Sequence, residues 1–212
     1  MTCFCTYILE YIKKDFDLNQ IKASKDALIL ISNTLTEVFP VFMTDVKSKY
    51  PGMDEKIDDD SLIKLVQSDC TLIACLLYRV ERRLFLEDSS SPILSNLANL
   101  MRTRTGIELY YSTEIGPGLN IQHGSGIVVG PRYFIGKNFM IHQGVTLGQR
   151  KAPTETIIIG DNVKIFAGAK VLGNITIGDN VKIAANAVLL TDALSDSTYI
   201  GIPAKRLEIT QL

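Results

Sequence analysis

The chain has 212 residues, of which 46% are hydrophobic and 21% charged, and its formal net charge is −1. This length suits one domain of ordinary size or two small ones, and the composition is that of a packed globular protein. A net charge so close to zero gives no sign of a nucleic-acid or anionic-membrane partner.

The first segment, "MTCFCTYILEYIKKDFD", places apolar residues before lysines, which is the reverse of a signal peptide. No apolar stretch is expected to span a bilayer, and "CTLIACLL" at 70–77 is interpreted as a buried helix face. The cysteines form no CxxC pair and have no histidine nearby, which argues against zinc. We therefore expect a cytoplasmic protein with reduced thiols, no metal and no membrane span.

Residues 1–106 are expected to form a helical domain. Apolar residues three and four positions apart recur in three segments, namely 26–50, 58–87 and 91–106. Pro40 is expected to kink or break the first of these helices. Asp60 or Ser61 is expected to cap the second, and Gly106 to end the third.

From residue 107 onward, glycine and β-branched residues become frequent, and aliphatic residues recur with a period of six. These positions are Ile115, Ile121, Ile127, Ile135, Ile141, Leu147, Ile159, Ile165, Val171, Ile177, Ile183 and Leu189. The pattern slips by two residues between Ile127 and Ile135. A small or β-branched residue, such as Ser125, often stands four positions after an aliphatic one. Its side chain is expected to occupy a second inward-facing position of the coil. This period predicts a coil of short strands, a parallel β-helix over 107–194, before a C-terminal tail at 195–212.

One stretch interrupts the coil. At 148–157 the sequence "GQRKAPTETI" is polar, and Pro153 stands where the period requires an aliphatic residue. We expect a loop that projects from the scaffold, and such loops often carry function. A plain connector is the alternative.

Particular repeats and motifs resemble a known family. Isoleucine-Gly-Asp-Asn-Val, at 159–163 and 177–181, resembles the hexapeptide repeat of left-handed parallel β-helix acyltransferases. "HGSGIVVG" from residue 123, "QGVTLG" from 143 and "GIPAK" from 201 are similar to the serine acetyltransferase family. That resemblance implies an α-helical N-terminal domain followed by a left-handed parallel β-helix. It also implies acetyl-CoA as co-substrate, bound between the β-helices of a homotrimer, with trimer and dimer of trimers both left open.

Acyl transfer to a hydroxyl needs a base at the attacking oxygen and donors for the oxyanion. The resemblance implies that His123 is this base and that Glu108, fifteen residues earlier, holds its other ring nitrogen. Related serine acetyltransferases carry Asp at the position of Glu108. Direct transfer without an acyl-enzyme is expected, because the nearest hydroxyl, that of Ser125, is assigned to an inward slot.

Further site residues follow from the same resemblance. His142, roughly one coil after His123, is expected to contact the acceptor or CoA, or to line a subunit interface. Gly144 and Gly148 are expected to allow close backbone approach of the pantetheine arm of CoA or of the oxyanion, and CoA is expected to pass Ala167 and Gly168. Its phosphates are expected to meet Lys182, Lys205 and Arg206. Tight corners and solvated cations are the plainer alternatives for these residues.

The chain departs from serine acetyltransferases at the residues expected to bind the acceptor. The family's Asp before the base is Gln122 here, and its Arg-His pair in the loop is replaced by Arg150 and Lys151 without a histidine. The family's helical domain also supplies an Asp, for which Asp58, Asp59 or Asp60 could stand in. An amide suits an uncharged hydroxyl. A sugar or polysaccharide precursor is therefore the predicted acceptor, and serine is the alternative.

Three other kinds of protein were weighed. A zinc enzyme on this fold would need three histidines, and the chain has two. A non-catalytic β-helix assembly protein would keep the repeats without needing His123 and Glu108. An N-acyltransferase would differ by accepting amines in place of alcohols.

Overall fold

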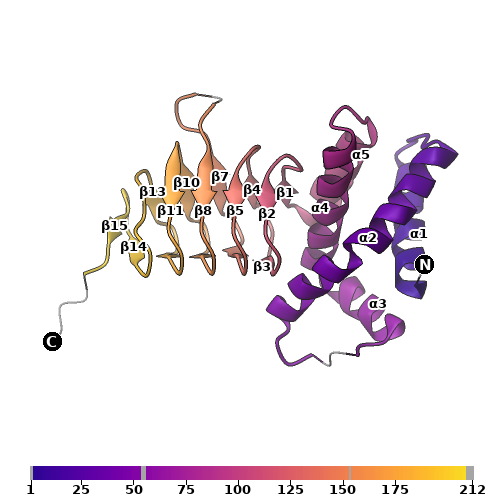
Figure 1. Ribbon diagram of the computed structural model, residues 1–212, viewed down its shortest axis with the longest axis horizontal. Coiled ribbons are helices and arrows are strands. Elements are labelled where there is room, and N and C mark those ends of the chain that lie inside the picture. Colours follow the sequence, from indigo (N-terminus) through magenta and orange to yellow (C-terminus); the bar gives the residue numbers. More distant parts are fainter. Residues whose placement is uncertain (1, 54–55, 153, 209–212) are drawn as a thin grey trace.

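The computed structural model describes residues 2–53, 56–152 and 154–208; Pro153 of the expected loop lies outside them. A group of helices forms one end of the molecule, and a coil of short strands extends away from it (Figure 1). The helices are α1 (Cys3–Leu18), α2 (Lys25–Lys49), α3 (Asp59–Ser68), α4 (Cys70–Glu87) and α5 (Ile93–Thr105).

The strands form three sheets along the coil, and each sheet takes one strand per turn. The first sheet holds β1 (Glu108–Leu109), β4 (Val128–Val129), β7 (Thr146–Gly148), β10 (Lys170–Leu172) and β13 (Val188–Leu189). The second holds β2 (Glu114–Ile115), β5 (Phe134–Ile135), β8 (Ile157–Ile159) and β11 (Ile175–Ile177). The third holds β3 (Asn120–Gln122), β6 (Met140–His142), β9 (Lys164–Ile165), β12 (Lys182–Ile183), β14 (Thr198–Ile200) and β15 (Lys205–Arg206).

Neighbouring strands are parallel, except that β15 pairs antiparallel with β14 at the far end. All twelve aliphatic positions of the sequence period are buried. The two-residue slip, however, lies elsewhere than expected. On β4 it is Val129, not Ile127, that pairs with Leu147. The extra residues therefore lie between Ile121 and Val129, in the turn that contains His123.

The helical domain differs from its prediction in three places. Helix α2 continues through Pro40, so a break there is wrong, and a kink at Pro40 stays a prediction. The segment at 58–87 is two helices, α3 and α4, that meet at 107°. The cap of α3 is Asp58, whose side chain accepts from the Ser61 N–H, rather than Asp60 or Ser61. Gly106 ends α5 with a φ of 68°, as expected.

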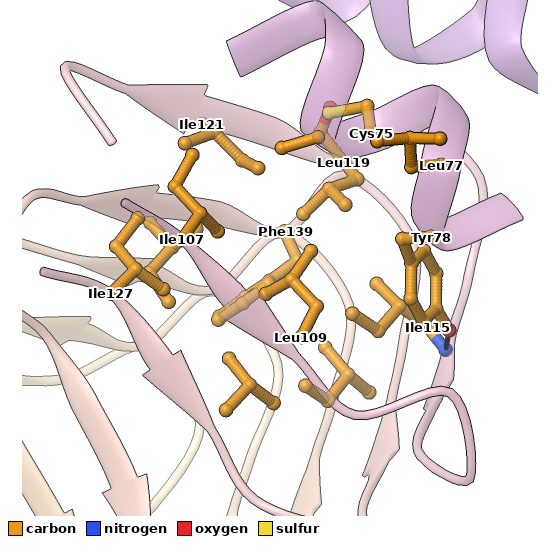
Figure 2. Packing of buried hydrophobic residues seen from close by; sticks show 14 of the residues in the cluster. Cys75, Leu77, Tyr78, Ile107, Leu109, Ile115, Leu119, Ile121, Ile127 and Phe139 are labelled. Atoms are coloured by element: carbon orange, nitrogen blue, oxygen red, sulfur yellow. Dashed lines mark hydrogen bonds between the residues drawn. The ribbon is translucent and has the colours of Figure 1, made fainter. Parts of the chain in front are cut away.

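Helix α2 is long and apolar enough to cross a membrane on length and composition, although the sequence was expected to contain no such segment. A core helix can meet the same test. In this fold α2 packs against α4, and its Asp45 is fully buried in an ion pair with Arg79. Figure 2 shows the junction, where Cys75 and Tyr78 of α4 lie over Ile115, Leu119 and other apolar residues of the first coil.

Candidate active site

His123 lies at the corner where β3 turns toward β4, and its side chain is exposed. Its φ is +62°, a left-handed conformation that is uncommon outside glycine. The corner contains the two residues that the next coil lacks, because Gln122 pairs with His142 while Ser125 O accepts from Gly144 N. The insertion thus takes His123 out of the register of the coil, and its side chain is exposed.

Ser125 is exposed, so its assignment to an inward slot is wrong; the shift in register puts Ile127 there instead. Its backbone N–H donates to the carbonyl oxygen of His123. Within the described residues, no hydrogen bond joins the Ser125 hydroxyl to the His123 ring. Ser125 therefore lacks the contact with a base that an acyl-enzyme nucleophile needs.

The structure brings the two histidines together. Their ring centroids lie 6.4 Å apart, and the His142 ring also lies 5.2 Å from that of Phe166. Burial lowers the pKa of His142, and the nearby charge of His123 lowers it further. His142 is therefore neutral at physiological pH beside His123. One of its ring nitrogens can donate a hydrogen bond and the other can accept one.

The same corner continues along the coil as a column of small residues. Gly126, Gly144 and Gly168 stack with positive φ, and a Cβ on Gly144 would lie 3.6 Å from the Cα of Gly168. Ala167 stands beside Gly168. The Gly144 N–H donates to Ser125 O and is not free for an oxyanion. The column thus brings successive coils close together on the same corner as His123, with Gly144, Ala167 and Gly168 along it.

Glu108 begins β1 and pairs with Val128, one coil below the His123 corner. Its side chain lines a pocket of about 200 Å³ with Ser95, Asn99, Arg102 and Tyr110, among others. Among the described residues no hydrogen bond joins the Glu108 carboxylate to the His123 ring. Its partner on the next coil is Val128, five residues beyond His123, so the pairing of Glu108 with His123 stays a prediction.

Gln122 is held by a chain of side-chain amides. Asn120 Nδ2 donates to the Ser48 carbonyl at 2.9 Å, and Gln122 Nε2 donates to Asn120 Oδ1 at 2.7 Å. One N–H of the Gln122 amide is thus engaged. Among the described residues no hydrogen bond to its second N–H or to its oxygen is found, so this amide can still donate and accept.

Arg150 and Lys151 lie in the loop that projects between β7 and β8 (Figure 1). Their backbone N–H groups both donate to Glu155 Oε2, at 2.6 and 3.1 Å. These hydrogen bonds lower the pKa of Glu155. The loop is therefore folded back on itself, with both cationic side chains exposed. Gly148 ends β7 where this loop starts.

The cations expected at the CoA phosphates lie farther along the third sheet. Lys182 is exposed on β12, two strands beyond β6 with its His142. Lys205 and Arg206 are exposed on β15 at the far end. The structure therefore groups Gly144, Ala167 and Gly168 with His123, but sets these three cations apart from it.

Two of the three candidate aspartates have other roles. Asp58 caps α3, and Asp59 Oδ2 accepts from the Phe4 N–H of α1 at 3.1 Å. Neither reaches the β-helix through these bonds. The contact that sequence reasoning missed is Lys49, which donates to the Ile121 carbonyl next to Gln122 at 2.7 Å. The two residues are 72 positions apart, and a lysine at a helix end gives no signal of such a contact.

The cysteines Cys3, Cys5, Cys70 and Cys75 are all free. No group of three or more His, Cys, Asp or Glu side chains that could hold a metal ion occurs in the part of the chain that the structure describes.

Comparison with known proteins adds the family. The family model described as bacterial transferase hexapeptide (six repeats) matches residues 156–191. A serine acetyltransferase of Synechococcus elongatus is 40% identical over 121 residues, which cover 54% of this chain and 48% of that protein. A serine acetyltransferase of Staphylococcus aureus is 49% identical over 109 residues, which cover 50% of this chain and 51% of that protein. This chain thus spans about half the length of these curated relatives.

Among solved structures, a Neisseria gonorrhoeae serine acetyltransferase in complex with serine matches with a TM-score of 0.74 and 33% identity, over 86% of this chain and 75% of that one. The chain belongs to the serine acetyltransferase-like hexapeptide-repeat acyltransferases. A serine acetyltransferase in complex with CoA matches with a TM-score of 0.70 and 25% identity, over 85% of this chain and 75% of that one. The expected fold, a helical domain followed by a left-handed parallel β-helix, is confirmed.

Proposed function

We propose that this chain is a serine O-acetyltransferase, which moves an acetyl group from acetyl-CoA to the hydroxyl of serine. The observation that carries this proposal is the 33% identity to an enzyme solved with serine, over 75% of that chain. The likeness to an enzyme solved with CoA supports acetyl-CoA as the donor. These relatives favour serine, the alternative acceptor, over the sugar that the sequence predicted first.

In the proposed reaction His123 takes the proton of the serine hydroxyl as that oxygen attacks the thioester carbonyl. A tetrahedral intermediate forms, its C–S bond breaks, and the CoA sulfur leaves with the proton from the His123 imidazolium. Glu108 is proposed to orient the imidazole and stabilise its charged form. Transfer is direct, in keeping with the absence, among the described residues, of a hydrogen bond between the Ser125 hydroxyl and the His123 ring.

The departures from the family can be reconciled with serine. The amide oxygen of Gln122 can accept a hydrogen bond from the serine ammonium, while Asn120 holds one N–H of the same amide. Arg150 and Lys151 offer exposed positive charge for the serine carboxylate. His142 is proposed to contact the acceptor beside His123.

For the donor, the proposal places the extended arm of CoA along Gly144, Ala167 and Gly168, the column of small residues at the corner. Gly148, Lys182, Lys205 and Arg206 stay predictions for the rest of the molecule. A homotrimer and a cytoplasmic location are likewise proposals that go with this function.

The test measures release of CoA thiol from acetyl-CoA with L-serine, sugars, nucleotide sugars and amines as separate acceptors. Serine alone is expected to support fast release. His123→Asn is expected to lower kcat by roughly 10²–10⁴-fold, while acetyl-CoA still raises the melting temperature. Glu108→Gln should lower kcat less, with little change in the KM for acetyl-CoA.

Release with a sugar only would overturn the choice of acceptor, and near wild-type turnover of His123→Asn would overturn the role of the base. No release with any acceptor, together with no thermal shift by acetyl-CoA, would point to a non-catalytic assembly protein.

A further inference from the structure

A buried polar cluster joins the helical domain to the strand that carries the active-site residues. Lys49, the last residue of α2, forms an ion pair with Asp69 Oδ2 at 2.7 Å, and the two side chains are only 11% and 14% exposed. Its Nζ also donates to the Thr71 hydroxyl and to the Ile121 carbonyl, the latter at 2.7 Å. Tyr50 adds a hydrogen bond to Asp69 at 2.8 Å.

The carboxylate of Asp69 is fully engaged within this cluster. Its other oxygen accepts from the Thr71 N–H at 3.0 Å and from the Thr71 hydroxyl at 2.7 Å. Burial alone would raise the pKa of Asp69, but the hydrogen bonds from Lys49, Thr71 and Tyr50 outweigh it and lower the pKa. Asp69 is therefore charged at neutral pH and holds the Lys49 ammonium in one place.

The Ile121 carbonyl is an exceptional place for such a contact. Strand β3 is the end strand of its sheet, with β6 on one side only. Asn120 N donates toward β6, so the next residue, Ile121, directs its carbonyl to the open edge. Lys49 satisfies this edge carbonyl, which immediately precedes Gln122 and His123.

The cluster supports the other side of His123 as well. A Cβ on Gly124 would lie 2.9 Å from the methyl group of Thr71 and 2.7 Å from the side chain of Ile107. Thr71 itself is 2% exposed. Its hydroxyl thus belongs to the cluster, while its methyl packs directly under the turn after His123. Residues 121 and 124, on either side of the base, are both held by the helical domain.

We propose that Lys49 is a positioning residue, which acts with Asp69 and Thr71 to fix the turn that carries His123. The inference rests on the proposed function of His123 as the base. The two-residue insertion takes this turn out of the register of the coil, and the helical domain contacts it on both sides of His123. A base displaced by about 1 Å can lose roughly 10²-fold in rate, so the helical domain contributes to kcat without touching the substrate.

The test compares Lys49→Met, which keeps the length but removes the donor, with Lys49→Arg, which keeps the donor. Lys49→Met is expected to lower kcat with serine by roughly 10- to 100-fold and to leave the KM for acetyl-CoA nearly unchanged. Lys49→Arg should restore most of the rate. Amide hydrogen exchange at residues 122–125 should be faster in Lys49→Met, while exchange at 159–165 stays as in the wild type.

The matched control is Arg104→Met, which breaks a different ion pair of the helical domain, to Asp15 at 2.7 Å. It is expected to lower the melting temperature but to leave kcat and the exchange at 122–125 unchanged. If Lys49→Met does not fold, Thr71→Val replaces it, because valine keeps the methyl contact and removes the hydroxyl.

Unchanged kcat or unchanged exchange at 122–125 in Lys49→Met would overturn the inference, as would an equal loss of kcat in Arg104→Met. If the wild-type protein does not turn over serine, the proposed function fails by itself. The exchange measurement then decides alone whether the cluster fixes the turn.

Discussion

At the scale of single residues, the most unusual group outside the site is Glu81 on α4. It is fully buried, and neither carboxylate oxygen has a hydrogen-bond partner among the described residues. Burial raises the pKa of Glu81 well above its ordinary value of 4.5. The folded protein therefore holds this carboxyl protonated at pH values where the unfolded chain ionises it.

The raised pKa predicts a stability that falls as pH rises. Below pH 4.5 the free energy of unfolding keeps the whole contribution of the protonated Glu81. This contribution is lost as pH rises from there through the folded pKa, because the unfolded chain ionises first. Glu81→Gln cannot ionise. Between pH 4.5 and the folded pKa of Glu81, its free energy of unfolding should therefore rise relative to that of the wild type by roughly 1 kcal/mol per pH unit. Urea unfolding at pH 5 and pH 8 measures the difference. Glu10→Gln, at a side chain 53% exposed, is the control; an equal pH dependence in both variants would contradict the prediction.

At the scale of elements, one corner of the β-helix carries a ladder of side-chain amides. Asn138 donates to Asn162 at 3.0 Å, Asn162 to Asn180 at 3.1 Å, and Asn180 to Asp196 at 2.8 Å. All four residues have φ between 55° and 59°. Asn and Asp tolerate this left-handed conformation better than other residues with a side chain. The ladder thus joins successive coils where the backbone turns.

Two substitutions at Asn162 separate the contributions of the ladder and of the backbone conformation. Asn162→Ala loses two hydrogen bonds and strains the positive φ, so the free energy of unfolding should fall by about 1–3 kcal/mol. Asn162→Gly loses the hydrogen bonds but keeps the conformation without strain, and should cost less. Chemical denaturation of both variants tests this order. A glycine variant as unstable as the alanine variant would show that the φ strain contributes nothing.

At the scale of the whole molecule, a buried ion pair within the helical domain joins the two domains through its hydrogen bonds to the first coil. Asp45 of α2 binds Arg79 of α4 at 2.9 Å and accepts from the N–H groups of Gly118 and Leu119 in the first coil. Arg79 in turn donates to the carbonyl of Gly116 at 2.8 Å. Unlike a surface pair, this one is shielded from water, so the loss of either partner leaves a buried charge.

Asp45→Asn should therefore lower the free energy of unfolding by roughly 3–5 kcal/mol. It should also separate melting of the helical domain from that of the β-helix, because the contacts of Asp45 span both. Differential scanning calorimetry measures both effects. Glu114→Gln removes an exposed ion pair with Arg82 at the same junction and should cost less than about 1 kcal/mol. Similar losses in the two variants would contradict the special role of the buried pair.

Much about this protein was determined by the sequence alone. The period of six predicted a β-helix, and all twelve of its aliphatic positions are buried. The apolar spacing likewise predicted helices in the first half of the chain. These features follow from short-range periodicity, since which side chains point inward depends on neighbours a few positions away. The motif around His123 indicated the family because its residues are also close together in the sequence.

The tertiary structure decided what depends on distant residues. The slip could be placed at the His123 turn only when β4 was seen to pair with β7. The orientation of the Gln122 amide depends on Asn120, whose own amide is held by the Ser48 carbonyl of the helical domain. The contact of Lys49 with the Ile121 carbonyl, across 72 residues, leaves no periodic trace. A coil repeats its own local pattern, whereas the support of the turn that carries His123 also comes from the packing of another domain against it.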